Sequence, residues 1–253
     1  MSNPLSFDTL ASRAKIAVIV PATNTVVQPE MEAMRPHGVT NHVSRMLLPP
    51  RPYDDMQAYQ QALKTEKGQL EEALALVMPC EPHAVAHGHS IHSFRGDLQR
   101  AQAEEARLQA LACIPFVTPS IAVLEGLKAI GNPKRIGVLT PYWPPADAII
   151  AEFFTACGFE VVASHGLKST GPISVAQFTP EQIMQGFEAL DKPQVQALVH
   201  VGTNLPVSAM TPAIEAHFGK PLIGVNVATY WLALRRLGLR DAMPGFGILA
   251  EQH

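Results

Sequence analysis

The fold of this chain can be inferred from one stretch, Ala84-Val85-Ala86-His87-Gly88-His89-Ser90-Ile91-His92-Ser93-Phe94-Arg95-Gly96. An apolar run that ends in small and hydroxyl residues before a helical segment is typical of a strand leading into a helix, where free backbone N–H groups attract anions. A second stretch has the same pattern, Ala197-Leu198-Val199-His200-Val201-Gly202-Thr203-Asn204-Leu205-Pro206. We therefore expect two seats for a carboxylate or phosphate, one in each of two related halves.

The composition indicates a well-packed α/β protein that acts on a small molecule. The chain has 253 residues, of which 47% are hydrophobic and 16% charged, enough for one large or two modest domains. Its formal net charge is −3 and no block of like charge occurs, so neither nucleic acid nor an anionic membrane is the expected partner. Residues 1–13 are polar, and no apolar run reaches the ~18 residues needed to span a bilayer, so we expect a cytoplasmic protein. The three cysteines are widely spaced, which favours reduced thiols over disulfides.

Apolar runs and helical spacing alternate along the first half. Lys15–Val20 is a continuous apolar run of strand length without polar alternation, which suits a strand buried on both faces of a parallel sheet, and Pro21 ends it. Thr118-Pro119-Ser120 resembles a helix cap. The other predicted strands are Val43–Leu48, residues 84–86 and Ile114–Val117, and the predicted helices are Met56–Val77, Leu98–Ala112 and Ile121–Ile130.

The second half repeats this alternation. Its predicted strands are Arg135–Leu139, Glu160–Ala163, Ala197–Val201 and Pro221–Val225, and its predicted helices are Ala146–Cys157, Gln182–Leu190, Ser208–His217 and Ala228–Leu237. The pattern predicts an α/β fold of two pseudo-symmetric, three-layer αβα (Rossmann-like) halves with parallel sheets and an active-site cleft between the halves, because such sheets bind ligands at strand carboxyl ends. We place the first half at residues 1–117, completed by a C-terminal helix within 226–253, and the second at 118–225.

Several short motifs, in this order, resemble those of one known superfamily. They are Pro21-Ala22-Thr23-Asn24-Thr25 with Pro29-Glu30, Thr118-Pro119-Ser120, Thr140-Pro141-Tyr142, Gly202-Thr203-Asn204-Leu205-Pro206 and Asn226-Val227-Ala228-Thr229-Tyr230-Trp231. Together they resemble the aspartate/glutamate racemase superfamily, on the branch of maleate cis-trans isomerases and arylmalonate decarboxylases, over roughly residues 15–240. In the decarboxylase a Gly-Thr-Ser…Arg-Gly loop resembles Gly88-His89-Ser90…Arg95-Gly96 here. The resemblance implies no cofactor, a small carboxylate substrate and a homo-oligomer, usually a dimer.

The resemblance also implies two facing cysteines, one per half, that act as acid and base or as nucleophile. This sequence aligns Gly88 and Gly202 with those two positions, and its cysteines at 80, 113 and 157 fall in neither loop. Racemisation and thiol-addition isomerisation then lack their usual groups, whereas decarboxylation of a malonate-like acid needs only an oxyanion seat and a proton donor. We therefore expect a lyase of the decarboxylase type. The alternatives are a maleate-type isomerase or a hydratase with histidine in place of cysteine, and a non-catalytic carboxylate-binding homologue.

Polar residues at the predicted strand ends form the expected binding site. The seven candidates for substrate binding are Asn24, Thr25, Ser90, Tyr142, Thr203, Asn204 and Thr118. The resemblance places residues matching Asn24, Thr25 and Tyr142 at the family's carboxylate pocket. Each candidate also has an ordinary structural explanation: turn formation for Asn24 and Thr25, aromatic packing for Tyr142, and helix capping for the others.

The histidines are the candidates for proton transfer, since imidazole titrates near neutral pH. His89 is the preferred donor, with His200 as the second candidate beside the two glycines. His87, His89 and His92 form an H-x-H-x-x-H pattern that is also compatible with zinc, although no carboxylate completes the spacing, so no metal is expected. Hydrogen bonding at a strand end is the competing explanation for His87 and His92.

Overall fold

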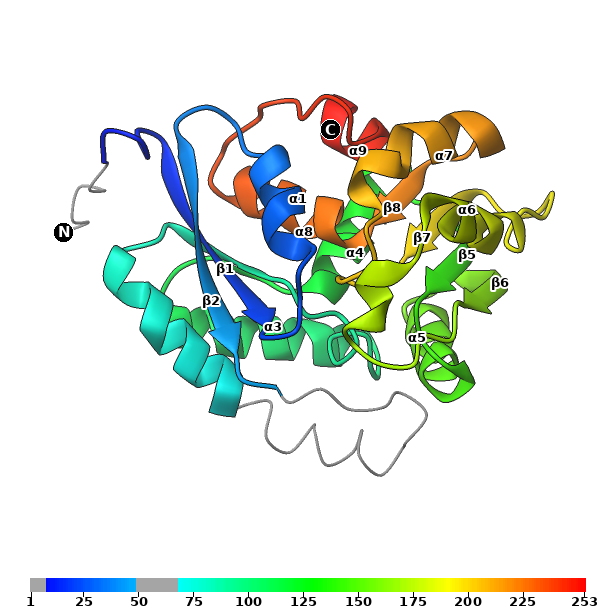
Figure 1. The fold of residues 1–253 in the computed structure, drawn as a ribbon, viewed down its shortest axis with the longest axis horizontal. Helices are drawn as coiled ribbons and strands as arrows, with labels where there is room; N and C mark the ends of the chain where they lie inside the picture. The colour runs from blue at the N-terminus through cyan, green and yellow to red at the C-terminus, as the bar shows by residue number, and fades with distance from the viewer. Residues whose placement is uncertain (1–7, 49–67) are drawn as a thin grey trace.

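The computed structural model describes residues 8–48 and 68–253, and Figure 1 shows its two parallel sheets. The strand order is β2-β1-β3-β4 in the first sheet and β6-β5-β7-β8 in the second, so both halves have the same topology. Helices flank both sheets, and the predicted α/β class is confirmed. The division of the chain into domains at residues 117 and 225 stays a prediction.

The first sheet is built around a central strand that is buried along its whole length, as the unbroken apolar run predicts. One edge strand, β2, begins four residues before the predicted start at Val43 and ends at Met46. An edge strand is partly exposed, and the first half of this one is therefore polar in sequence. The strands are β1 (Ala14–Pro21), β2 (Val39–Met46), β3 (Ala84–His87) and the very short β4 (Phe116–Val117).

The second sheet repeats the first in register as well as in order. Ile19 of β1 lies opposite His87 of β3, and Leu139 of β5 lies opposite His200 of β7. The two histidines therefore occupy equivalent places at the carboxyl ends of equivalent strands. The strands are β5 (Arg135–Thr140), β6 (Glu160–Gly166), β7 (Ala197–His200) and β8 (Leu222–Gly224).

The sequence did not predict α1 or α9; the other helices lie close to their predicted positions, and α3 matches its prediction residue for residue. The predicted helix Met56–Val77 lies partly outside the described residues; positions 68–77 are helical. The α-helices that lie wholly within the described residues are α1 (Val27–Ala33), α3 (Leu98–Ala112), α4 (Pro119–Ala129), α5 (Pro144–Ala156), α6 (Pro180–Glu188), α7 (Thr211–Phe218), α8 (Val225–Arg236) and α9 (Ile248–Gln252). Short 3₁₀ turns occupy Met78–Cys80, Ser174–Gln177 and Ser208–Met210.

Helices α4 and α8 occupy the centre of the molecule, between the blue strands of the first sheet and the strands of the second (Figure 1). Residues 225–234 of α8 are all buried, because this helix packs against α4, α1, β3 and β8 at once. One hydrophobic cluster consequently runs through both halves, with smaller clusters on the outer faces of the two sheets. The strand ends of the two halves are thereby held facing each other across a shared core.

Two local predictions need correction. Thr118 stands at the N-cap position of α4 but its side chain makes no capping bond, because its hydroxyl donates to buried Glu105 instead (2.8 Å). The stretch after residue 237 also contains α9, a short helix that the sequence did not reveal. Within the described part of the chain, none of the helices is long and apolar enough to cross a membrane.

Candidate active site

Loops from the carboxyl ends of β1, β3, β5 and β7 meet at one place between the halves. They bring together five buried polar residues, which we call the carboxylate seat: Asn24, Ser90, Tyr142, Thr203 and Asn204. The Asn24 amide nitrogen donates to the Thr203 hydroxyl (3.3 Å), and the Thr25 backbone N–H donates to the side-chain oxygen of Asn204 (2.9 Å). The predicted meeting of the two loops is thus observed, although Thr25 contributes its backbone while its side chain is exposed.

Ser90 is the centre of the seat. Its hydroxyl lies 3.1 Å from the Tyr142 hydroxyl and accepts the Thr203 backbone N–H at 3.3 Å. The bonds to Thr203 are long for their type, and four donors share few acceptors here: the Asn24 amide, the Thr203 N–H and the two hydroxyls. A carboxylate offers about four lone-pair sites, so one oxyanion can replace these long contacts with shorter, charge-assisted bonds.

Local structure fixes the direction of the Asn24 side chain. Its amide oxygen accepts the backbone N–H groups of Val26 (3.0 Å) and Val27 (2.9 Å) at the start of α1. The amide nitrogen then faces Thr203 of the second half. Turn formation and ligand binding, which the sequence offered as alternatives, are compatible because they use opposite ends of one amide.

The sequence pattern predicted that the amino ends of two helices would form the seat, and this prediction is wrong. Helix α3 begins at Leu98 and is capped by Asp97, whose carboxylate accepts the Arg100 N–H (2.9 Å). Helix α7 begins at Thr211, well after the Gly202 loop. Both loops run through several turn residues first, so the donors of the seat are side chains and single loop amides, and Ser90 and Thr203 cap no helix.

Glu30 also lies in this region, although the sequence analysis named it only as part of the Pro29-Glu30 motif. Its carboxylate accepts the backbone N–H (2.9 Å) and the hydroxyl (2.5 Å) of Ser208 and the side-chain amide of Asn226 (2.7 Å). Desolvation raises the pKa of this carboxyl group above its ordinary value. The available signals were a glutamate in the first turn of a short helix, α1, and a polar side chain, Asn226, on the mostly apolar helix α8.

The three histidines of the first loop lie close together. The ring centroids of His89 and His92 are 4.9 Å apart, and those of His87 and His89 are 6.1 Å apart. His87 is buried against Phe116, whereas His89 is partly exposed and adjoins Ser90 of the seat. Over residues 8–48 and 68–253, no three His, Cys, Asp or Glu side chains are grouped as metal ligands would be.

His200 lies beneath the second loop and is fully buried. Burial lowers the pKa of this imidazole to about 3, only partly offset by a backbone interaction at Gly202. Its Nε2 atom has no hydrogen-bond partner in the described part of the protein. The imidazole is therefore neutral at ordinary pH, which does not suit the role of proton donor that the sequence left open for it.

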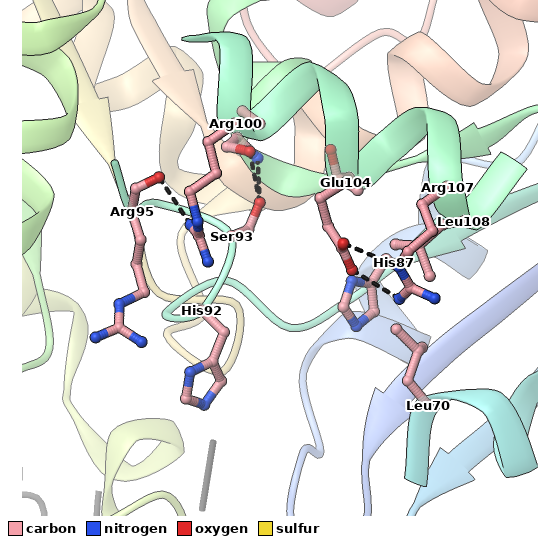
Figure 2. Close-up of a pocket in the computed structure, with 12 residues that line it drawn as sticks. Leu70, His87, His92, Ser93, Arg95, Arg100, Glu104, Arg107 and Leu108 are labelled. Atoms are coloured by element: carbon pink, nitrogen blue, oxygen red, sulfur yellow. Dashed lines mark hydrogen bonds and ion pairs between the residues drawn. The ribbon is translucent and has the colours of Figure 1, made fainter. Parts of the chain in front are cut away.

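A cavity of about 240 Å³ adjoins the histidine loop, and Figure 2 shows residues that line it. His87 lies beside the Arg107–Glu104 ion pair, and His92 lies apart from them, below Ser93 (Figure 2). Thr118 lines this cavity and bonds to Glu105, so it does not join the seat as predicted. The structure thus gathers six of the seven predicted binding residues and places the seventh elsewhere.

The two glycines aligned with the family's cysteines lie in tight surroundings. A Cβ atom on Gly88 would lie 2.8 Å from side-chain carbons of Val20 and Val27, and one on Gly202 would lie 2.4 Å from the Pro141 ring. No side chain fits at either position without movement of its neighbours.

All three cysteines of the chain lie away from the seat. Cys80 ends a 3₁₀ turn, Cys113 follows α3 at the surface, and Cys157 follows α5. Burial raises the pKa of the Cys157 thiol to about 11, which leaves it protonated and unreactive. The seat therefore contains no thiol.

The protein has two parallel α/β halves, and hydrogen-bond donors at their strand ends face each other. This arrangement is typical of proteins that bind a small polar ligand between two halves. Comparison with known proteins identifies the family to which the chain belongs. The chain matches the family model described as arylmalonate decarboxylase over residues 16–250, and it belongs to that family.

Its relatives include isomerases and a decarboxylase. The maleate isomerase of Pseudomonas putida is 29% identical over 249 residues, covering 93% of this chain and 96% of the relative. The arylmalonate decarboxylase of Bordetella bronchiseptica is 28% identical over 170 residues, or 65% and 69% of the two chains. A structure of a cysteine-to-serine variant of Nocardia farcinica maleate cis-trans isomerase, with a covalently bound succinylcysteine intermediate, superimposes with a TM-score of 0.84 at 22% identity, covering 95% and 99%. That likeness establishes the fold.

Proposed function

We propose that this protein is a cysteine-independent decarboxylase of a small malonate-like dicarboxylic acid. The observation that carries the proposal is a buried seat of hydrogen-bond donors, contributed by both halves, in a site without a thiol. Such donors stabilise negative charge on oxygen and require no nucleophile.

In the proposed reaction, one carboxylate of the substrate occupies the seat and accepts hydrogen bonds from the Asn24 amide, the Thr203 N–H and the Ser90 and Tyr142 hydroxyls. The bond from the α-carbon to the second carboxyl group breaks, carbon dioxide leaves, and the electron pair passes into the first carboxylate to form an enediolate. The added negative charge falls on oxygens that the donors already contact, so the donors stabilise the transition state more than the substrate. One proton on the α-carbon completes the monocarboxylic acid.

His89 supplies that proton in the proposal. It adjoins Ser90 and is partly exposed, so its imidazole can exchange protons with water. His200 is buried and uncharged, which leaves His89 as the better donor of the two.

The relatives favour a second candidate, isomerisation of a maleate-like acid, because the maleate isomerases match over more of the chain than the decarboxylase does. The Nocardia enzyme carries a succinylcysteine, and forming such an adduct requires a thiol. This chain has no thiol at the seat, so an isomerase here would have to use another nucleophile, such as His89. A carboxylate-binding protein without turnover is the remaining alternative.

The test is proton NMR in deuterated water with chelator-treated protein and a panel containing a methyl-phenylmalonate, maleate, aspartate, glutamate and substituted succinates. We expect loss of one carboxyl group from the malonate, with deuterium at the α-carbon.

The variants His89→Ala and Ser90→Ala should each lower turnover at least ~100-fold. His217→Ala, on the exposed face of α7, is the matched control and should leave turnover unchanged. Unchanged turnover in both seat variants would contradict the mechanism. Conversion of maleate to fumarate would favour the isomerase, and line broadening without turnover would favour a binding protein.

A further inference from the structure

We propose that Glu30 is a positioning residue that holds the second half's loop, residues 202–208, in the geometry that the carboxylate seat requires. This inference rests on the proposed function, because it concerns the same site. Glu30 does not bond to any seat residue directly, so it acts through its neighbours.

The first step is the attachment of the loop. Glu30 belongs to α1 of the first half, and its two carboxylate oxygens accept the backbone N–H and the hydroxyl of Ser208 at the end of the loop. One oxygen also accepts the amide of Asn226 on α8. One carboxylate thus joins α1, the loop and the central helix.

The second step is the orientation of Asn226. Its amide nitrogen donates both to Glu30 (2.7 Å) and to the carbonyl oxygen of Thr203 (2.9 Å). Its amide oxygen is buried and has no hydrogen-bond partner among the described residues. Only the two acceptors hold the amide, since the reversed orientation would place its oxygen against two other oxygens. Neutralising Glu30 therefore weakens one of the two hydrogen bonds that orient the Asn226 amide.

The third step connects Thr203 to the ligand. The Thr203 carbonyl is fixed by Asn226, while its N–H points at Ser90 and its hydroxyl accepts from Asn24. These two contacts are 3.3 Å long, whereas the bonds around Glu30 are 2.5–2.9 Å. The short bonds are therefore on the Glu30 side of Thr203, and the long ones are on the side where the proposed carboxylate would bind. This is the arrangement expected of a rigid support behind exchangeable donors.

The chemistry of the cluster requires a carboxylate at this position. The Ser208 N–H and the Asn226 amide can only donate at the atoms that face Glu30. A glutamine in the same rotamer would direct an NH₂ group at one of these donors, so Glu30→Gln conserves shape while it breaks the pattern. Glu215 offers a matched control: its carboxylate accepts the backbone N–H groups of Leu222 (2.9 Å) and Ile248 (3.0 Å) and joins α7 to β8 and α9 without contact with the seat.

The test compares Glu30→Gln with Glu215→Gln and uses two measurements. Amide hydrogen exchange of the Thr25 and Thr203 N–H groups reports the geometry of the seat without any ligand, and isothermal titration with malonate reports its affinity. We expect Glu30→Gln to accelerate exchange at both amides by roughly tenfold or more and to weaken malonate binding by a similar factor, the equivalent of one hydrogen bond to a charged group. Glu215→Gln should change neither, whatever it does to the unfolding midpoint.

The outcomes separate this inference from the proposed function. If Glu30→Gln and Glu215→Gln have the same exchange rates at Thr25 and Thr203, the positioning role is overturned. If the wild-type protein binds no malonate but Glu30→Gln still accelerates exchange at these amides alone, the positioning role holds and the proposed ligand is wrong. Should Glu30→Gln fail to fold, Ser208→Ala removes one bond of the same cluster and is expected to produce a smaller change in the same direction; no change in that variant would overturn the inference.

Discussion

Buried, uncharged His200 should make the stability of this protein sensitive to acid. The pKa of its imidazole falls from 6.5 to about 3 on folding, because the ring is taken out of water and gains no charged partner. Below pH 6.5 the unfolded chain binds a proton at this residue and the native protein does not. Stability from this group is therefore fully present above the unfolded pKa and is lost as the pH falls.

The size of the effect follows from the two pKa values. Each pH unit between the native and the unfolded pKa costs about 1.4 kcal/mol, so lowering the pH from about 7 to about 4.5 should remove roughly 2.5 kcal/mol of the free energy of unfolding through His200 alone. Glu30, Asp147 and Glu215 act in the opposite direction, since burial raises their pKa values. A comparison between variants is needed to separate these contributions.

The assay is urea unfolding of the wild-type protein, His200→Asn and His200→Gln at several pH values in this range. Neither replacement titrates, so each variant should lose roughly 2.5 kcal/mol less than the wild type on acidification, even if its stability at neutral pH is lower. The exposed-histidine variant His217→Ala should follow the wild type. Parallel pH profiles for the wild type and both His200 variants would refute the argument, and so would an imidazole signal of His200 that titrates between pH 5 and 8.

Three further predictions concern the seat and its support. Tyr142→Phe removes a hydroxyl donor and should lower turnover or malonate affinity about 10-fold with little change in the unfolding midpoint, measured by steady-state kinetics or titration. Glu105→Ala leaves the N–H and hydroxyl of Thr118 without their acceptor and removes one partner of the partly buried Arg236 guanidinium, so it should cost ~2–3 kcal/mol in urea unfolding. Glu104→Ala, on the exposed face of the same helix, should cost under ~1 kcal/mol. Gly202→Cys forces the Pro141 ring to move and should lower the unfolding midpoint; an unchanged midpoint would show that the loop yields freely.

Much of the fold was predictable because it depends on patterns that are local in sequence. Strands such as β1 and β5 are continuous apolar runs ended by proline or threonine, and α3 has a capping aspartate before its first turn. The edge strand β2 was misplaced because exposure on one side makes its beginning read as a loop. Helix α9 was missed because five residues carry too little periodicity to detect.

The sequence predicted which polar residues come together in the carboxylate seat, but it did not predict the hydrogen bonds of Glu30 behind the seat. Asn24, Ser90 and Thr203 each follow a strand, and the carboxyl ends of parallel strands meet at one edge. The bond between Glu30 and Ser208 joins residues 178 positions apart, and no spacing rule connects them. Thr118 shows the converse: its hydroxyl follows a strand, as a ligand-binding group would, but it donates its hydrogen bond to the buried carboxylate of Glu105 on α3.

The two halves share a topology but supply different chemistry, and this difference constrains the product. The equivalent histidines His87 and His200 are both buried at strand ends. The first half adds the partly exposed His89, whereas the second half adds Tyr142, Thr203 and Asn204 to the seat but no further histidine. In the proposed reaction the enediolate is planar, and a proton supplied by His89 would reach it from the first half alone, because neutral His200 would not deliver one to the other face. A prochiral, disubstituted malonate should therefore give one enantiomer of the monocarboxylic acid. A racemic product would mean that water or a second group protonates the opposite face, and the assignment of His89 as the donor would then fail.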